Sequence, residues 1–304
     1  MQPGGKDADP IINAMTIDVE DYFHVSVFDG VVPRMRWDGF ESRVCANTDR
    51  LLRLFDDHDV TATFFVLGWV ADRFPELVRR IASLGHEIAS HGYSHRLVYD
   101  QTPGAFRNDV RRAKGVLEAA ALTYVRGYRA PSYSITPRSL WALDILIEEG
   151  YSYDSSIFPI RHDRYGIPLS PRHPYLLHRK AGTLIEAPAS TAAVGPVNLP
   201  VAGGGYFRIL PYGWTRWGIQ RVNGREQRPV IFYLHPWEID PKQPRLQTGA
   251  LSRFRHYHNL ERTEERLRQL LQDFRFGPMS TVLASTTRSQ NIAGQPALAL
   301  PYLW

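Results

Sequence analysis

The chain of 304 residues carries 36 Lys and Arg against 31 Asp and Glu, a net charge of +5, with 43% apolar and 22% charged residues. This composition is that of a folded globular protein and argues against global disorder. The small positive excess is spread along the sequence, so nucleic acid is not an expected partner. Cys45 is the only cysteine, which excludes a disulfide framework or a thiolate metal cluster and fits a reducing compartment.

No targeting segment is visible in the sequence. Residues 1–10 are rich in Gly, Asp and Lys and lack the apolar run of a signal peptide. Nowhere do about 18 consecutive apolar residues occur, the length that a membrane-spanning helix requires. We therefore expect a cytoplasmic protein with a flexible N-terminus at residues 1–10 and no transmembrane segment.

The first predicted element is a buried strand within residues 11–21, which ends in three carboxylates, Asp18, Glu20 and Asp21. Acidic residues at the carboxyl end of a strand lie where α/β folds place their chemistry. Asp18 and Glu20 alternate with Val19, so both face the same side of an extended chain. One could bind a metal while the other remains free as a base. The alternative is that these carboxylates cap the next element.

Strand and helix patterns alternate over the following hundred residues. Helical spacing with start and stop signals predicts helices at residues 47–58, 74–85, 103–122 and 136–150. Runs of β-branched and aromatic residues predict strands at residues 61–68, 87–90 and 123–128. Polar residues recur at the same end of successive strands. This alternation predicts a parallel α/β barrel.

The pattern changes after residue 157. Pro and Gly become frequent and helical periodicity fades, so we interpret residues 158–228 as an insertion, irregular up to about residue 205, with one strand at 182–187. A clear strand at 229–234 follows, then a helix at 256–274 and a closing strand at 280–284. The predicted organisation is one barrel over residues 11–285, with an extension at 250–279 and a tail at 286–304.

A histidine pair supplies candidate metal ligands. His91 and His95 stand four residues apart around a Gly, so their imidazoles can converge on one point in a helical turn or a tight loop. Zinc accepts imidazole nitrogens, and a catalytic zinc site usually adds a carboxylate and leaves a position for water. The pair alone is weak support, because most such histidines are structural. The carboxylates after the first strand supply the missing ligand type.

Five short motifs, in this order, resemble those of the polysaccharide deacetylases of the NodB-homology type, carbohydrate esterase family 4. They are Thr16-Ile17-Asp18-Val19-Glu20-Asp21, His91-Gly92-Tyr93-Ser94-His95, Arg129-Ala130-Pro131-Ser132-Tyr133, Asp154-Ser155-Ser156 and Leu234-His235. The first motif is most similar to the branch that uses Asp-x-Asp/Glu, with relatives among peptidoglycan deacetylases and allantoinase-like amidases. Residues 254–279 resemble the C-terminal extension of deacetylases found with bacterial exopolysaccharide synthesis.

The resemblance implies a fold and an activity. The fold would be a distorted (β/α)7–8 barrel with an irregular insertion and a C-terminal helical extension. The activity would be metal-dependent removal of N-acetyl groups from an N-acetylhexosamine-containing polysaccharide, or from its lipid- or nucleotide-linked precursor. One divalent metal ion, expected to be zinc, would be the cofactor. The alternatives are an allantoinase-like amidase on a small amide and an inactive glycan-binding protein.

The resemblance also implies the metal ligands and the base. Glu20, His91 and His95 would hold the metal, with Asp21 as a rival to Glu20 because the family's usual adjacent Asp pair is absent. Asp18 would be the general base, and Arg129 would keep it ionised. Arg129 could instead close an ion pair under a loop.

The remaining roles concern the acid and the substrate. His235 would be the general acid, oriented by Asp154, although Asp154 could merely cap a turn. The backbone N–H near Tyr133 would be the oxyanion donor. The Trp common in the family's fourth motif is missing, so Trp237 or Tyr233 would line the acetyl pocket.

Overall fold

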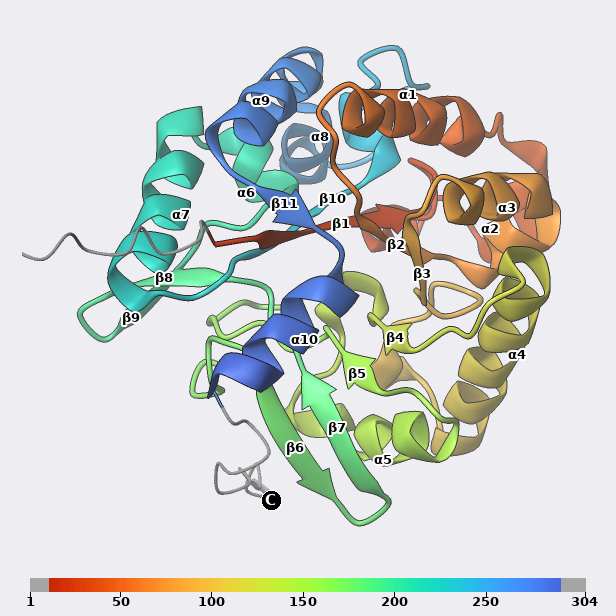
Figure 1. Cartoon of the computed structure of the whole chain (residues 1–304). Helices are drawn as coiled ribbons and strands as arrows, with labels where there is room; N and C mark the ends of the chain where they lie inside the picture. The colour runs from red at the N-terminus through yellow and green to blue at the C-terminus, as the bar shows by residue number, and fades with distance from the viewer. Residues whose placement is uncertain (1–10, 291–304) are drawn as a thin grey trace, which may run out of the picture.

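The computed structural model of the chain describes residues 11–290. Its centre is a nine-stranded sheet whose pairings follow the order β10-β1-β2-β3-β4-β5-β7-β6, with β11 paired to β1 (Figure 1). The strands are β1 Asn13–Val19, β2 Thr63–Val66, β3 Glu87–Ser90, β4 Gly127–Tyr128, β5 Tyr153–Asp154, β6 Tyr175–Arg179, β7 Gly182–Glu186, β10 Ile231–Leu234 and β11 Phe276–Gly277. A separate hairpin pairs β8 Thr191–Val194 with β9 Val197–Pro200.

Helices surround these strands (Figure 1). They are α1 Val44–Asp56, α2 Gly68–Arg73, α3 Pro75–Ser83, α4 Pro103–Ala121, α5 Trp141–Glu148, α6 Gly204–Ile209, α7 Tyr212–Glu226, α8 Ala250–Tyr257, α9 Leu260–Asp273 and α10 Met279–Gln290. Local interactions explain where a helix begins and ends, as in α4. Thr102 accepts a hydrogen bond from the Ala105 N–H to start α4, and Leu122 ends that helix in the left-handed conformation.

Parallel pairing fixes where the polar side chains meet. Every pairing in the sheet is parallel except β6 with β7. The strands β1, β2 and β10 are buried along their whole length, as expected for strands covered on both faces. The α/β prediction is therefore confirmed, and the carboxyl ends of β1, β3, β4, β5 and β10 lie at one edge.

Two predictions about the second half were wrong. The region interpreted as an insertion contains β6 and β7. The strand β7 confirms the one predicted at 182–187, but it pairs with β5 in parallel, so this region belongs to the main sheet. The expected closing strand at 280–284 lies within α10, and the strand that joins β1 is instead β11. A short apolar run with β-branched residues suits either state.

The helix α10 covers the amino ends of the strands. Its first N–H groups donate to the side chains of Thr63 and Glu87, which begin β2 and β3. Its apolar side chains pack on Ala14, Phe65 and Ala89. Residues 286–290 continue this helix and are not a tail, whereas the predicted flexible N-terminus at 1–10 and residues 291–304 lie outside the described residues.

Within residues 11–290, none of the helices combines the length and the apolar character that crossing a lipid bilayer demands.

The approach of Gly203 to β10 predicts a strong stability effect. Gly203 has φ +116°, and a Cβ there would lie 1.9 Å from the Tyr233 carbonyl oxygen. Gly203→Ala should lower the free energy of unfolding by about 3 kcal/mol or more, because backbone must move. The control is Gly224→Ala, at a helical position with open space, which should be neutral or stabilise by up to about 1 kcal/mol. Equal effects in urea unfolding would contradict this account.

Candidate metal and acid–base site

The carboxyl ends of the parallel strands bring most of the predicted residues together. Asp18 lies in β1 and Glu20 follows it, His91 follows β3, Arg129 follows β4 and His235 follows β10. All but His235 are almost completely buried. The side chain of His235 keeps 18% of its surface exposed, so it is the one of these groups that a substrate can reach directly.

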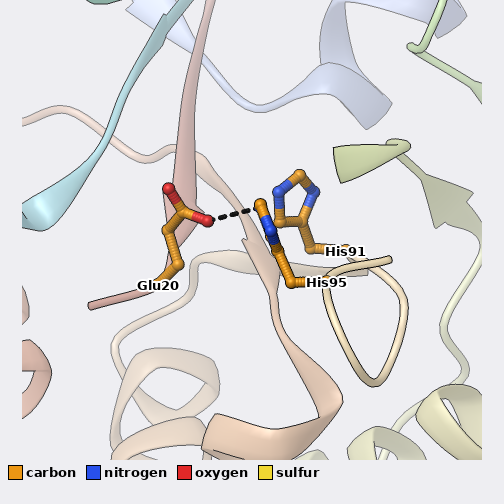
Figure 2. Close-up of side chains that lie close together, drawn as sticks. All are labelled: Glu20, His91 and His95. Atoms are coloured by element: carbon orange, nitrogen blue, oxygen red, sulfur yellow. Dashed lines mark ion pairs between the residues drawn. The ribbon is translucent and has the colours of Figure 1, made fainter. Parts of the chain in front are cut away.

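Glu20, His91 and His95 form the only group of three potential metal ligands found among residues 11–290. One ligand atom from each residue lies within 4.8 Å of the others, and all three residues are buried. The three side chains point toward a common space, and the dashed line marks the ion pair between Glu20 and His95 (Figure 2). Their convergence matches the predicted metal site.

The donor chemistry of these residues fits a divalent cation. The Nδ1 of His91 is bonded to the carbonyl oxygen of Arg129 at 2.9 Å, which leaves Nε2 for a metal. Burial lowers the pKa of His91 to about 4, so this imidazole is neutral, as a ligand must be. Burial alone would raise the pKa of Glu20, yet the neighbouring His95 and the other imidazoles hold it well below its usual range.

The loop that carries the two histidines is held by Asp109, which the sequence analysis missed. One carboxylate oxygen of Asp109 accepts from the Tyr93 N–H at 2.7 Å, and the other accepts from the Ser94 N–H at 3.1 Å. The loop needs this support because His95 has φ +50°, a conformation that is costly without Gly. No feature of the sequence around Asp109 indicated this role.

The buried ion pair between Arg129 and Asp18 is present as predicted. Arg129 Nη1 donates to Asp18 Oδ1 at 2.6 Å and to Thr16 Oγ1 at 2.8 Å. The guanidinium is completely buried and lies over the ring of Phe65. The second carboxylate oxygen of Asp18 lies 3.8 Å from His235 Nε2.

The carboxylate that orients His235 is Glu238, so the prediction for Asp154 was wrong. His235 Nδ1 lies 2.7 Å from Glu238 Oε1, and its Nε2 lies 3.6 Å from Glu20 Oε1. Burial opposes the charged imidazole, but Glu238 first, then Glu20 and Asp18, raise the pKa of His235 to about 9. The signal was present in the sequence: Pro236 opens a 3₁₀ turn with His235 and Glu238 in the capping-box positions.

Asp154 instead belongs to a buried carboxyl pair. Its Oδ1 accepts from Ser156 Oγ at 2.5 Å, which agrees with the alternative reading of a turn cap. Its partner across the sheet is Glu186, the register neighbour in β7. Both groups are fully buried. Burial and the charge of Asp154 raise the pKa of Glu186 well above its usual value, so Glu186 holds a proton beside the Asp154 carboxylate.

Asp21 is also structural and not a rival ligand. Its Oδ2 accepts from Ser42 Oγ at 2.7 Å and from the Arg43 and Val44 N–H groups at 2.8 and 3.2 Å. These contacts satisfy N–H groups at the start of α1. The first motif therefore places Asp18 in the ion pair with Arg129, Glu20 in the Glu-His-His group and Asp21 at the start of α1.

The residues predicted to contact the substrate are Tyr133 and either Trp237 or Tyr233. The Tyr133 N–H donates to the Ala130 carbonyl at 3.1 Å, so the structure does not support it as a free oxyanion donor. The Tyr133 hydroxyl, by contrast, is buried and has no hydrogen-bond partner among the described residues. Trp237 stacks on His235 and donates its indole N–H to Glu20 Oε1 at 3.2 Å. Tyr233 packs edge-on against Tyr133.

The ligand assignment predicts different outcomes for adjacent carboxylates. Glu20→Gln should weaken Zn²⁺ binding by more than about 100-fold, beyond the effect of most residues outside the ligand set. Asp21→Asn should leave affinity unchanged and lower the free energy of unfolding by about 1–3 kcal/mol, because buried N–H groups lose an acceptor. Calorimetric titration of chelator-treated protein and urea unfolding measure the two effects. The reverse pattern would identify Asp21 as the ligand.

The buried pair predicts a pH effect on stability. The folded state keeps a proton on Glu186 that the unfolded chain releases above its ordinary pKa of 4.5, so this stabilisation is complete below that pH and is lost as the pH rises toward the folded pKa. Above that pH the wild type should lose up to about 1.4 kcal/mol per pH unit from this group until the folded pKa is reached. Glu186→Gln should lose less in urea unfolding, and an identical loss would exclude the shared proton.

Comparison with known families divides the chain into two matched parts. Residues 37–147 match the family described as polysaccharide deacetylase. Residues 155–284 match a domain of unknown function, DUF3473. The boundary between the matched parts lies close to Asp154, so His91 and His95 fall in the first part and His235 falls in the second.

Curated relatives match about a third of the chain. A peptidoglycan-N-acetylglucosamine deacetylase of Bacillus cereus is 31% identical over 120 residues, which are 36% of this chain and 44% of that protein. A chitooligosaccharide deacetylase of Bradyrhizobium sp. is 30% identical over 99 residues, 33% of this chain and 43% of the relative. The chain thus spans less than half the length of these two relatives.

Solved structures share the fold over the whole chain. A Mycobacterium smegmatis protein described as a polysaccharide deacetylase superposes with a TM-score of 0.60 at 21% identity, covering 99% of this chain and 98% of that one. The allantoinase Puue gives a TM-score of 0.58 at 13% identity, covering 91% and 90%. Residues 37–147 of the chain are therefore similar to the polysaccharide deacetylases, and residues 155–284 match a family with no assigned function.

Proposed function

We propose that the protein is a metal-dependent hydrolase that removes N-acetyl groups from an N-acetylhexosamine-containing glycan or from its lipid- or nucleotide-linked precursor. The observation that carries this proposal is the convergence of a buried Glu-His-His group with Asp18 and His235. The names of the curated relatives, a peptidoglycan-N-acetylglucosamine deacetylase and a chitooligosaccharide deacetylase, support the same substrate class.

Glu20, His91 and His95 would hold the metal. We propose zinc, because two imidazole nitrogens and one carboxylate oxygen form a ligand set that Zn²⁺ takes in catalytic sites. When bound, such an ion lowers the pKa of a water molecule and polarises the acetyl carbonyl. The hydrogen bond of His91 Nδ1 to the Arg129 carbonyl and that of the Trp237 indole to Glu20 would keep the ligands oriented.

Asp18 and His235 would move the protons. An amide is a poor electrophile with a basic leaving group, so hydrolysis needs one group to accept the proton of water and another to donate a proton to the departing nitrogen. Asp18, paired with Arg129, would accept the first proton. His235, protonated by its contact with Glu238, would donate the second. The products are acetate and the free amine of the sugar.

The proposal predicts different losses of activity and bound metal in two variants and no loss in a control variant. Asp18→Asn should lower acetate release from N-acetylated chitooligosaccharides by about 100- to 10,000-fold, the usual contribution of a general base, while retaining metal. His91→Ala should lose both metal and activity. His178→Ala, which removes a largely exposed imidazole, is the matched control and should change neither. Elemental analysis and acetate release from glycan fragments measure these quantities.

Other outcomes would redirect the assignment. Bound zinc without acetate release from chitooligosaccharides or peptidoglycan fragments, but with turnover of small cyclic or linear amides, would indicate an amidase. Glycan binding that persists in Asp18→Asn, with no turnover in the wild type, would indicate a binding protein. Absence of metal in the purified and zinc-supplemented wild type would overturn the role given to His91 and His95.

A further inference from the structure

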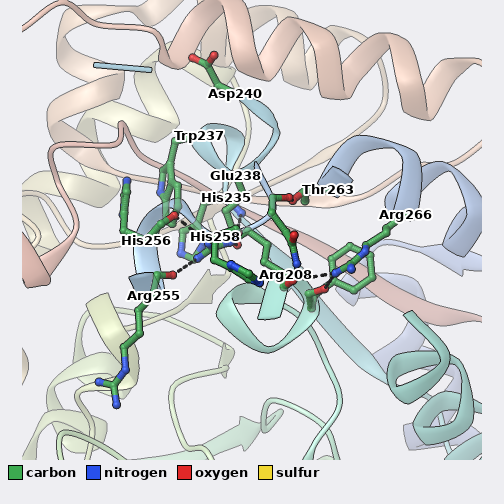
Figure 3. Close-up of polar contacts among 12 residues, drawn as sticks. Arg208, His235, Trp237, Glu238, Asp240, Arg255, His256, His258, Thr263 and Arg266 are labelled. Atoms are coloured by element: carbon green, nitrogen blue, oxygen red, sulfur yellow. Dashed lines mark hydrogen bonds and ion pairs between the residues drawn. The ribbon is translucent and has the colours of Figure 1, made fainter. Parts of the chain in front are cut away.

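Arg208 is a buried arginine outside every motif of the sequence analysis. It lies in α6 and is only 2% exposed. Its Nε donates to Glu238 Oε2 at 2.5 Å. Its Nη1 donates to the His256 carbonyl at 2.8 Å and the His258 carbonyl at 3.2 Å, and its Nη2 donates to the Arg255 carbonyl at 2.8 Å (Figure 3). The guanidinium therefore ties Glu238 to the end of α8.

Both carboxylate oxygens of Glu238 accept hydrogen bonds. Its Oε1 accepts from the His235 backbone N–H at 3.0 Å and faces His235 Nδ1 at 2.7 Å, while its Oε2 accepts from Arg208. It is completely buried. A carboxylate without water remains charged and fixed only when protein donors replace the lost hydration. Arg208 is the cation that does so here.

A ring stack fixes the same imidazole from its face. The rings of His235 and Trp237 lie 5.2 Å apart at 25°, and those of Trp237 and His256 lie 4.2 Å apart at 14°. Gln243 links two members of this stack, because its side chain donates to the Trp237 carbonyl and its Oε1 bonds His256 Nε2 at 2.8 Å. Both the edge and the face of His235 are thus positioned by contacts that lead to α8.

We propose that Arg208 and Glu238 are positioning residues that hold the His235 imidazole with Nε2 directed at the reacting amide, and that the end of α8 is part of this support. The proposal rests on the role of His235 as general acid in the proposed function. It assigns a catalytic purpose to the C-terminal part of the chain, where residues 155–284 match a family of unknown function. Arg208 acts through Glu238 and does not itself contact the substrate.

A dependence on the leaving group distinguishes positioning from a structural role. The amine of an N-acetyl sugar must be protonated as the carbon–nitrogen bond breaks, whereas the nitrophenolate of 4-nitrophenyl acetate leaves without a proton. A displaced imidazole should therefore slow amide hydrolysis and spare ester hydrolysis. General loss of folding or of metal should reduce both reactions together.

The test variant is Arg208→Lys, which keeps the charge but cannot make the same set of hydrogen bonds. It should lower kcat for N-acetylated chitooligosaccharides by about 10- to 100-fold, the usual effect of losing a supporting residue, with KM and zinc content unchanged. Hydrolysis of 4-nitrophenyl acetate should stay within about threefold of the wild type by the leaving-group argument. Glu238→Gln, of equal size, should show the same split if Arg208→Lys fails to fold.

The matched control is Arg266→Lys. Arg266 donates to the carbonyls of Phe207, Arg208 and Leu210, so it stabilises α6 through similar bonds without touching Glu238. It should leave the ratio of amide to ester hydrolysis unchanged. If Arg208→Lys and Arg266→Lys reduce both reactions in the same proportion, Arg208 is only structural and the inference is wrong.

A readout independent of turnover separates this inference from the proposed function. Nitrogen-15 NMR of the histidines, assigned with His235→Gln, should show a hydrogen-bonded His235 Nδ1–H in the wild type and in Arg266→Lys, and its loss in Arg208→Lys. No turnover by the wild type with this signature intact would refute the proposed function while confirming the positioning. Turnover in the wild type and an unchanged signature in Arg208→Lys would refute the inference alone.

Discussion

The buried guanidinium of Arg129 is the group on which the site depends most. This guanidinium donates to Thr16 and Asp18 of β1 and to Ser155 beyond β5. The backbone carbonyl of Arg129 is hydrogen-bonded to Nδ1 of His91. One residue thus contacts the proposed base, a proposed metal ligand and the segment that follows β5. Burying this cation in an apolar interior would cost several kcal/mol if any of these partners were missing. Folding of the sheet and assembly of the site are therefore the same event, because the partners come together only when the strands pair in register.

Asp18 and His235, the two groups proposed to transfer protons, are supported by different structural elements. Asp18 is held from within the sheet, by a cation that follows β4. His235 is held from outside, by the Glu238–Arg208 pair and the stack on His256, which lead to α6 and α8. This division agrees with the partial exposure of His235 and the burial of Asp18. A group that must meet different substrates needs access, whereas a base activating water needs a fixed environment.

Much of the site could be predicted because parallel strands align their carboxyl ends. The spacing of His91 and His95 and the carboxylates after β1 indicated candidate ligands, and the resemblance of five motifs to the polysaccharide deacetylases assigned the ligand set and the pairing of Arg129 with Asp18. Asp154 was misassigned because the sequence does not reveal that its register neighbour is Glu186, with which it pairs across β5 and β7. Glu238 was readable from the turn after Pro236, but Arg208 was not, since its partners lie about 30 to 50 residues further along the chain. The helix α10 was misread as a strand because its start is set by Thr63 and Glu87, which are remote in sequence.

The segment that matches the deacetylase family does not contain all the residues of the proposed site. Residues 37–147 contain His91, His95 and Arg129, but Asp18 and Glu20 precede this range and His235 follows it. The indole of Trp237 reaches back from the second matched part to Glu20, so even the metal ligands are oriented by residues of both parts. Substitutions in either matched part should consequently affect the same proposed metal and acid–base site. The two family matches therefore describe sequence relationships and do not mark two separate functional units.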